Sequence, residues 1–340
     1  MTDSLQTLDV LGTAAAACLR DGRVAIATII DTWGSAPVPV GGQMVIDTNG
    51  AFQGSVSGGC VEGDVIAEAM ELLETGGGRR VLSFGVEDEA AWRVGLPCGG
   101  KIRILVELHA GEDGLRHLDR LVAARQAREA LVVTTPLGAG AARVRTRSDA
   151  TTPSHIAAVF QSAKSGVEET ADGEVFVHAL VPPPRVLVIG ATHIGQVLCE
   201  LVRIVGFEAI VVDPRPAFAA EARFGATRIV NEWPQDALPK IGLDAYTAVA
   251  ALAHVGHIDD EALKLALKSD CFYVGGLGSR RTHAKRVERL AEAGLAAEEI
   301  GRIKSPIGLD LGATTPPEIA LSVMAEILRA LRGAKGKGAA

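Results

Sequence analysis

Pairs of glycines flank two of the five cysteines in this 340-residue chain. The members of the two motifs are, in chain order, Gly58, Gly59, Cys60, Cys98, Gly99 and Gly100. A glycine pair permits a tight turn, and the positive end of a helix dipole favours a thiolate. The apolar spacing in "VEGDVIAEAMELLETGG" predicts a helix that begins near Val61, directly after Cys60. The sequence therefore predicts a turn that favours a thiolate or a bound anion, although a structural role for both cysteines stays open.

The other three cysteines have apolar surroundings. Cys18 and Cys199 lie on apolar faces of predicted helices, and Cys271 begins a predicted buried strand. Core packing is the expected role of cysteine in such places. Because five is an odd number and no CxxC pair occurs, neither a disulfide framework nor a structural zinc site is expected.

A second glycine turn occurs in "RVLVIGATHIGQVLCELVRIVGFEAIVVDPRP", which predicts a strand, a turn, a helix and a second strand. Gly190 and Gly195 match the first and third glycines of the dinucleotide-binding fingerprint. Asp213 follows at about the separation at which an acid binds a ribose hydroxyl. Thr192 replaces the middle glycine, where the backbone would approach a pyrophosphate. The segment predicts a nucleotide-type site that disfavours ordinary NAD(P), with a site that has lost its ligand as the alternative.

Two further segments place polar side chains at predicted strand ends. In "GGLGSRR", backbone amides and the guanidiniums of Arg280 and Arg281 could clamp a phosphate, with Ser279 beside them, and a solvated helix start is the alternative. In "HVGHIDD", His254, His257 and Asp259 could ligate a metal, which is the weaker interpretation because polar loops gather at such strand ends in any case. No catalytic constellation is evident, so no catalytic residue is assigned.

The composition argues against two classes of protein. The chain has 34 Lys and Arg against 41 Asp and Glu, a formal net charge of -7, which disfavours a nucleic acid partner. No apolar run reaches the roughly 18 to 20 residues that a membrane span requires. The first residues, "MTDSLQTLDV", carry acids where a leader would carry bases. A cytoplasmic protein without a membrane span is therefore expected.

A run of prolines, "VPPP", divides the chain into two predicted domains. The second alternates buried strands with helices, which predicts a Rossmann-like, doubly wound α/β domain. The first is predicted to be an α+β domain, with a hairpin at the Asn-Gly turn of "DTNGAF". Its last strands could continue the same sheet. The predicted boundaries are residues 1–180, with 114–180 as an extension or linker region, residues 181–332, and a disordered tail at 333–340.

The motifs together resemble the xanthine dehydrogenase accessory protein family (XdhC/CoxI) in both halves of the chain. "GSAPVPVGGQMVI", "GSVSGGCVEGDV" and "LPCGGKIRILVE" resemble motifs of its N-terminal domain. "PPPRVLVIGATHIG", "VVDPRP", "YVGGLGSRR" and "SPIGLDLGATTPPEIALSVMAEIL" resemble its Rossmann-like C-terminal domain. Members of that family are generally dimeric maturation factors, which bind the molybdenum-pterin cofactor, support its sulfuration and help insert it into molybdenum hydroxylases.

The resemblance implies a cofactor-binding chaperone rather than a catalyst. It implies that Cys60 and Cys98 contact the molybdenum or carry sulfur, and that the Gly190 turn binds the tail of the cofactor, in a mononucleotide or dinucleotide form. The implied partners are a client apoenzyme such as xanthine dehydrogenase, a cysteine desulfurase as sulfur donor, and a second copy of the chain. Two alternatives stay open, an NAD(P)-dependent oxidoreductase and an assembly factor for a carbon monoxide dehydrogenase-type client.

Overall fold

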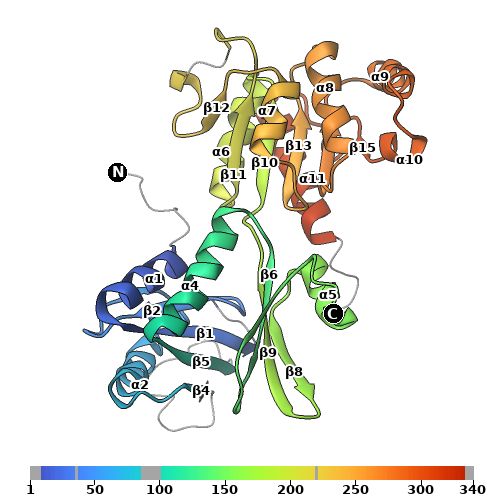
Figure 1. Cartoon of the computed structure of the whole chain (residues 1–340). Helices are drawn as coiled ribbons and strands as arrows, with labels where there is room; N and C mark the ends of the chain where they lie inside the picture. The colour runs from blue at the N-terminus through green and yellow to red at the C-terminus, as the bar shows by residue number, and fades with distance from the viewer. Residues whose placement is uncertain (1–8, 35–36, 86–100, 219–220, 334–340) are drawn as a thin grey trace. The chain divides into compact units, whose positions relative to one another are not determined.

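The computed structural model describes residues 9–34, 37–85, 101–218 and 221–333. Contacts divide the chain into two compact units, of which the first ends at Pro182 and the second begins at Pro183 (Figure 1). Apart from Gly333, the predicted tail lies outside the described residues. None of the helices in these ranges combines the length and the apolar character that crossing a membrane requires.

A five-stranded antiparallel sheet forms the centre of the first unit, with helices on both faces (Figure 1). Its strands lie in the order β3-β2-β1-β5-β4. They are β1 (Arg23–Trp33), β2 (Gln43–Ile46), β3 (Phe52–Gly54), β4 (Arg79–Phe84) and β5 (Lys101–Ala110). The hairpin between β2 and β3 confirms the predicted Asn-Gly turn, in which Gly50 has a φ of 77°.

Alternation along β1 distributes its apolar side chains between two cores. Ala25, Ala27 and Ile29 face the core beneath α2 (Glu62–Thr75). Val24 and Ile26 face the opposite core, which is covered by α1 (Val10–Asp21) and α4 (Gly111–Gln126). The sheet therefore has two buried faces, and the Cys60 turn lies on the α2 side.

The strands after α4 form a sheet of their own. They are β6 (Leu131–Pro136), β7 (Arg143–Thr146), β8 (Gly166–Thr170) and β9 (Gly173–Leu180), with α5 (Ser154–Ser162) between β7 and β8. They pair in the order β7-β6-β9-β8, so the expectation that they continue the first sheet is wrong. The physical reason lies in β6, whose Leu131 and Val133 pack against Leu11 of α1 and Leu121 of α4. A strand that covers these helices cannot extend the edge of the first sheet.

Six parallel strands form the sheet of the second unit, which confirms the predicted doubly wound domain. They are β10 (Arg185–Ile189), β11 (Glu208–Val212), β12 (Arg228–Val230), β13 (Thr247–Ala251), β14 (Tyr273–Gly276) and β15 (Ile303–Lys304). The spatial order is β12-β11-β10-β13-β14-β15. Counted from the first strand of the unit, this is the arrangement of dinucleotide-binding folds, whose ligand crevice opens where the order reverses, between β10 and β13.

Helices cover both faces of this parallel sheet (Figure 1). One face packs against α6 (His193–Ile204) and α11 (Pro316–Gly333). The other packs against α7 (Pro234–Ile241), α8 (Gly256–Leu267), α9 (Arg280–Glu292) and α10 (Ala297–Ile300). Successive residues of β10 divide between the two cores, with Leu187 and Ile189 on one side and Val186 and Val188 on the other.

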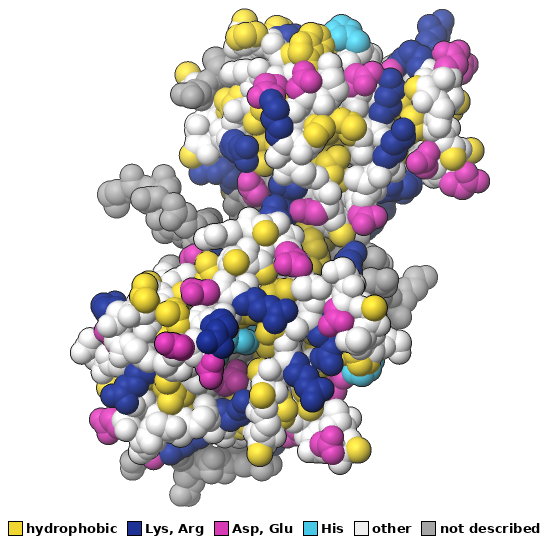
Figure 2. Space-filling view, viewed as in Figure 1, with side chains coloured by type: hydrophobic (Ala, Val, Ile, Leu, Met, Phe, Trp, Pro, Cys, Tyr) yellow, Lys and Arg dark blue, Asp and Glu magenta, His cyan; other side chains and the backbone are white. Residues whose placement is uncertain are grey.

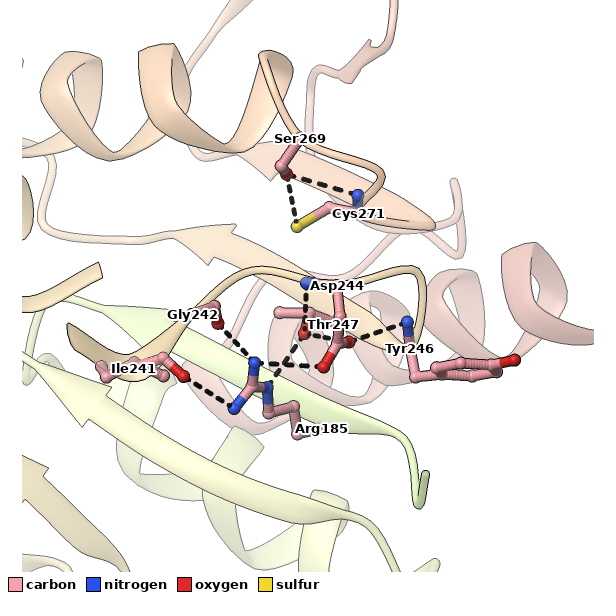
Figure 3. A network of polar contacts seen from close by, with 8 residues as sticks. All are labelled: Arg185, Ile241, Gly242, Asp244, Tyr246, Thr247, Ser269 and Cys271. Carbon is pink, nitrogen blue, oxygen red and sulfur yellow. Dashed lines mark hydrogen bonds and ion pairs between the residues drawn. The ribbon is translucent and has the colours of Figure 1, made fainter. Parts of the chain in front are cut away.

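A buried arginine closes the amino ends of the two central strands (Figure 3). Arg185, the first residue of β10, donates to Thr247 Oγ1 of β13 at 2.9 Å. Its guanidinium also donates to the carbonyl oxygens of Ile241 and Gly242 and pairs with Asp244 at 3.3 Å. This network belongs to the amino edge of the sheet, whereas the glycine turns follow the carboxyl ends of the strands.

Candidate functional site

Cys60 lies in the turn that leads into α2, as the sequence predicts. The helix begins at Glu62, with Val61 at its N-cap. The Cys60 amide donates to Ser57 Oγ at 2.9 Å, and the Val61 amide donates to the same oxygen at 3.0 Å. The Cys60 side chain is half-buried against the core beneath α2. The turn therefore holds this cysteine at the amino end of a helix, with part of its surface accessible.

The carboxylate of Glu62 organises this turn, which sequence reasoning missed. It accepts hydrogen bonds from the amides of Val56, Ser57, Gly58 and Gly59 and from the hydroxyls of Ser55 and Ser57. The four amide distances run from 2.9 to 3.2 Å. An acid at the first helical position, just after a glycine-rich turn, was the available signal.

These contacts fix the charge of Glu62. Burial raises the pKa of the carboxyl, but hydrogen bonds from Ser57, Ser55 and the backbone outweigh burial and bring the pKa to about 2. Glu62 is therefore a carboxylate at neutral pH. It occupies the position beside the turn amides where the sequence predicts an external anion, so the protein supplies its own anion there. The Cys60 side chain stays partly accessible beside this carboxylate.

The second glycine-flanked cysteine lies outside the described residues, together with Gly99 and Gly100. That the Cys98 turn meets the Cys60 turn therefore stays a prediction. Pro37, from the "GSAPVPVGG" segment, does lie beside the Cys60 turn, because a Cβ on Gly58 would be 3.5 Å from Pro37 Cγ.

Burial of the three remaining cysteines confirms their packing role. Cys18, Cys199 and Cys271 are all buried, and all have free thiols. Burial raises the pKa of each, to about 12 for Cys199. Cys60 is thus the one cysteine in the described ranges whose side chain a ligand can reach.

A pocket opens in the first unit at the ends of β1, β4 and β5. Its volume is about 410 Å³, a size that suits a small molecule. Its lining consists of Asp31, Trp33, Ser83, Phe84, Gly85, Lys101, Ile102 and Arg103. Trp33 is 71 % exposed, and Arg103 forms a two-pronged ion pair with Glu174 at 2.7 and 2.6 Å. The pocket offers an aromatic face and charges of both signs to a planar polar ligand.

The Gly190 turn of the second unit follows β10 at the edge where the crevice of this fold opens. Gly190 has a φ of 103°, and a Cβ there would lie 2.4 Å from Ala253 Cα. A Cβ on Gly195 would lie 2.9 Å from the Gly190 carbonyl oxygen. Both positions therefore require glycine, one for the turn and one for close packing of α6 against the strand.

Thr192, at the position of the missing middle glycine, caps α6. Its Oγ1 accepts a hydrogen bond from the Gly195 amide at 3.1 Å. This is the usual role of threonine at an N-cap. The sequence predicts an obstruction at this position, and the structure adds that the hydroxyl is engaged by the helix.

Asp213 is fully buried and engaged by its own chain. Its Oδ2 accepts from the Ala191 amide at 2.7 Å, and the Arg215 guanidinium binds both carboxylate oxygens at 2.9 and 2.7 Å. Burial raises the pKa of Asp213, but hydrogen bonds from Arg215 and Ala191 outweigh it and hold the pKa below its ordinary value. The acid that the sequence assigns to a ribose hydroxyl thus anchors the Gly190 turn, and a ribose would have to displace Arg215 to reach it.

Ser279 and Arg280 begin α9 at the end of β14. The Ser279 hydroxyl accepts from the Thr282 amide at 3.2 Å, and Arg280 is exposed at the first helical position. The serine is therefore an N-cap, and the arginine is accessible to an anion.

The histidines after β13 are exposed, whereas Asp259 is buried. Asp259 Oδ1 accepts from the Ala253 amide at 3.1 Å, so this acid serves its own turn. In the described ranges, no three side chains of His, Cys, Asp or Glu gather closely enough to hold a metal ion. The metal interpretation of His254, His257 and Asp259 finds no support there.

Acidic and basic side chains are interspersed on the face of each unit that Figure 2 shows. On that face the described residues therefore mix both signs of charge, which weakens the attraction of a polyanion.

Two family models match the chain. Residues 17–85 match the XdhC and CoxI family, and residues 186–327 match the XdhC Rossmann domain. The first range contains the Cys60 turn, and the second contains the Gly190 turn. The matches therefore include the turns described above in both units.

Relatives align with nearly the whole chain. The molybdenum cofactor insertion chaperone PaoD of Escherichia coli (strain K12) is 28% identical over 328 residues, 96% of this chain and 89% of that protein. A protein of Bacillus subtilis (strain 168), named as a probable xanthine dehydrogenase subunit, is 27% identical over 328 residues, 92% of this chain and 95% of that protein. A crystal structure described as a xanthine dehydrogenase from Bacillus halodurans shares the fold, with a TM-score of 0.67, 24% identity and 97% of each chain covered.

Proposed function

Because this chain belongs to the XdhC and CoxI family, we propose that it is a maturation factor that binds the molybdenum cofactor. The observation that carries the proposal is the 28% identity, over 96% of the chain, to a protein named as a molybdenum cofactor insertion chaperone. In this role the protein supports sulfuration of the cofactor and its insertion into a molybdenum hydroxylase such as xanthine dehydrogenase. It is a chaperone and not a catalyst.

The Cys60 turn has the chemistry that a molybdenum centre requires. The cofactor supplies a soft, thiophilic metal, and thiolate sulfur is the protein ligand that soft metals prefer. Glu62 and Ser57 satisfy the amides of the turn, so the cysteine is presented on a backbone that is already fixed. In the proposal Cys60 contacts the metal or carries the sulfur, and Cys98 completes the same site.

The Gly190 turn is the proposed site for the anionic tail of the cofactor. Gly190 gives this turn its shape, and Arg215 lies beside it with its side chain 30% exposed. Guanidinium groups and turn amides suit a phosphate. The Arg215 guanidinium binds both carboxylate oxygens of Asp213, so this acid is not available to a ribose hydroxyl. This disfavours the NAD(P)-dependent oxidoreductase.

The proposal places the protein in the cytoplasm with three kinds of partner. These are the client apoenzyme, a cysteine desulfurase that supplies sulfur, and a second copy of the chain. A client of the carbon monoxide dehydrogenase type would change the apoenzyme and leave the site chemistry the same.

Purification from cells that make the cofactor tests this proposal. Molybdenum and pterin should copurify with the folded protein, and the loaded protein should activate a molybdenum hydroxylase apoenzyme on mixing. A folded protein that carries neither, from cells whose other molybdenum enzymes are active, would contradict the proposal. Substrate-dependent reduction of NAD or NADP would support the oxidoreductase instead.

A further inference from the structure

His254 has a left-handed backbone conformation, which is uncommon for residues other than glycine. Its φ is 59°, in the left-handed region where a Cβ crowds the backbone. Arg128 and Ala163 also have positive φ, but each closes the end of a helix, α4 or α5, where this conformation is common. His254 instead follows β13 and precedes α8, so no helix end accounts for its conformation.

The residues before His254 are held on two sides. Asp259 Oδ1 accepts from the Ala253 amide at 3.1 Å, and the Asp259 side chain is 1% exposed. The Leu252 amide donates to the Ile189 carbonyl at 2.7 Å, and the Gly190 backbone packs directly against Ala253. The conformation at His254 is thus imposed by the turn.

A buried arginine joins this turn to the next one. Arg286 Nη2 lies 3.9 Å from Asp259 Oδ2 and donates to the Leu277 carbonyl at 2.8 Å. The Arg286 side chain is 3% exposed, and its Nε and Nη1 have no hydrogen-bond partner. A Cβ on Gly276 would lie 2.6 Å from Nη1, so glycine is needed there to admit the guanidinium. A buried guanidinium therefore connects the turn that follows β13 to the turn that follows β14, although burying such a charge costs free energy.

The His254 side chain is exposed, whereas the acids of these turns are buried. Asp213 and Asp259 are both buried and engaged, the first by Arg215 and the second by the Ala253 amide. Neither carboxylate is therefore accessible for direct contact with a ligand. Arg280 is exposed at the start of α9, after the neighbouring strand β14, and Arg215, after β11, has a side chain that is 30% exposed. Such surroundings favour an anionic ligand over a cation.

We infer that His254 contacts the ligand of the crevice, and that its imidazole binds the phosphate of the pterin cofactor's tail. Strained residues persist where the surroundings over-determine them, and they cluster at ligand sites. Glycine would adopt this φ without strain, whereas histidine at this position adds an exposed imidazole beyond the carboxyl end of β13. The inference rests on the proposed function for the identity of the ligand. The chemistry it requires is that of a phosphate ester.

Inorganic pyrophosphate is the probe that tests this inference without molybdenum. Calorimetry should show binding to the wild-type protein, and His254→Gly should weaken it at least fivefold. The thermal midpoint of His254→Gly should be at or above that of the wild type, because the strain is relieved. Ala163→Gly is the matched control, since it relieves a left-handed residue at a helix end and should leave the affinity unchanged.

Equal pyrophosphate affinity in the wild type and His254→Gly, or no binding by the wild type, would overturn the inference. His254→Asn provides a second variant, because asparagine tolerates the left-handed region and lacks the imidazole. It too should bind at least fivefold more weakly. If pyrophosphate follows this pattern while no molybdenum cofactor copurifies, the proposed function fails and the role of His254 stands.

Discussion

The Cys60 turn and the Gly190 turn are both glycine-rich, and a carboxylate of the protein anchors each of them. The two carboxylates are stabilised in different ways. Glu62 accepts from four amides and two hydroxyls of its own turn, all of them neutral donors. Asp213 accepts from the Ala191 amide and is bound by the Arg215 guanidinium.

The difference shows what each turn leaves for a ligand. The Glu62 carboxylate accepts from the amides of its turn, so an external anion would be repelled there. The reactive group that stays accessible beside it is the thiol of Cys60. Arg215 neutralises Asp213 from the solvent side, so part of a cation is exposed beside the Gly190 turn. The Cys60 turn therefore suits a soft metal, and the Gly190 turn suits an anion.

Removing the Glu62 carboxylate is the most severe way to break this comparison. Glu62→Ala removes the acceptor of six hydrogen bonds in the turn and should destabilise the first unit by about 4 kcal/mol. Urea unfolding measures the change. Asp64→Ala removes an exposed acid from the same helical turn and should cost less than about 0.5 kcal/mol. Similar losses in both variants would contradict the organising role of Glu62.

Removing the cation from Asp213 should have a smaller effect. Arg215→Ala leaves a buried carboxylate with backbone partners only, and should destabilise the second unit by about 2 to 3 kcal/mol. Arg203→Ala, at an exposed position of α6, is the control and should change little. A stability of Arg215→Ala equal to that of the control would show that Asp213, like Glu62, is satisfied without a cation.

Acid should reveal the low pKa of Glu62. The folded pKa is about 2 and the ordinary value is 4.5, so this carboxylate contributes stability above about pH 4.5. That contribution is lost as the pH falls from there towards 2, and amounts to up to about 3 kcal/mol. Glu62→Gln should lack this part of the pH dependence. A stability profile that is identical in the wild type and Glu62→Gln between roughly pH 5 and pH 2 would refute the assignment.

The smallest expected effect concerns the cap of α6. Thr192→Ala removes the acceptor of the Gly195 amide and should lower the free energy of unfolding by about 1 kcal/mol. Thr192→Ser keeps a hydroxyl acceptor and should lose only a small part of that stability. Thermal unfolding of the two variants measures the difference. Pyrophosphate affinity of Thr192→Ala separates the roles, because an obstruction predicts tighter binding and a ligand contact predicts weaker binding. Equal stability of both variants would show that the cap contributes little.

Local patterns were sufficient to predict much of the fold. The buried strands of the second domain can be predicted because a central parallel strand, such as the one around Val249, is buried on both faces and has a continuous apolar run. The hairpin was predicted because Asn49-Gly50 suits the left-handed turn. The separate sheet that begins at β6 was not predicted, since its pairing depends on Leu131 and Val133 packing against distant helices.

The candidate sites show the same limit. The start of α2 beside Cys60 follows from local spacing. The contacts of Glu62 depend on how the whole turn folds back on the helix, and spacing alone does not specify them. For Asp213 the fingerprint rule predicted a ribose, because it does not include the competing arginine two residues later. The left-handed φ of His254 depends on Asp259 and Gly190, which no short motif contains together.

The most direct test of the account is the molybdenum bound per folded protein in Cys60→Ser and Cys18→Ser, measured beside their thermal midpoints. Cys60→Ser keeps the turn and replaces a soft ligand by a hard one, so bound molybdenum should fall at least tenfold with little change in stability. Cys18→Ser places a hydroxyl in a buried position, so stability should fall while molybdenum per folded molecule is kept. Wild-type molybdenum content in Cys60→Ser would contradict the central claim that the Cys60 turn holds the metal.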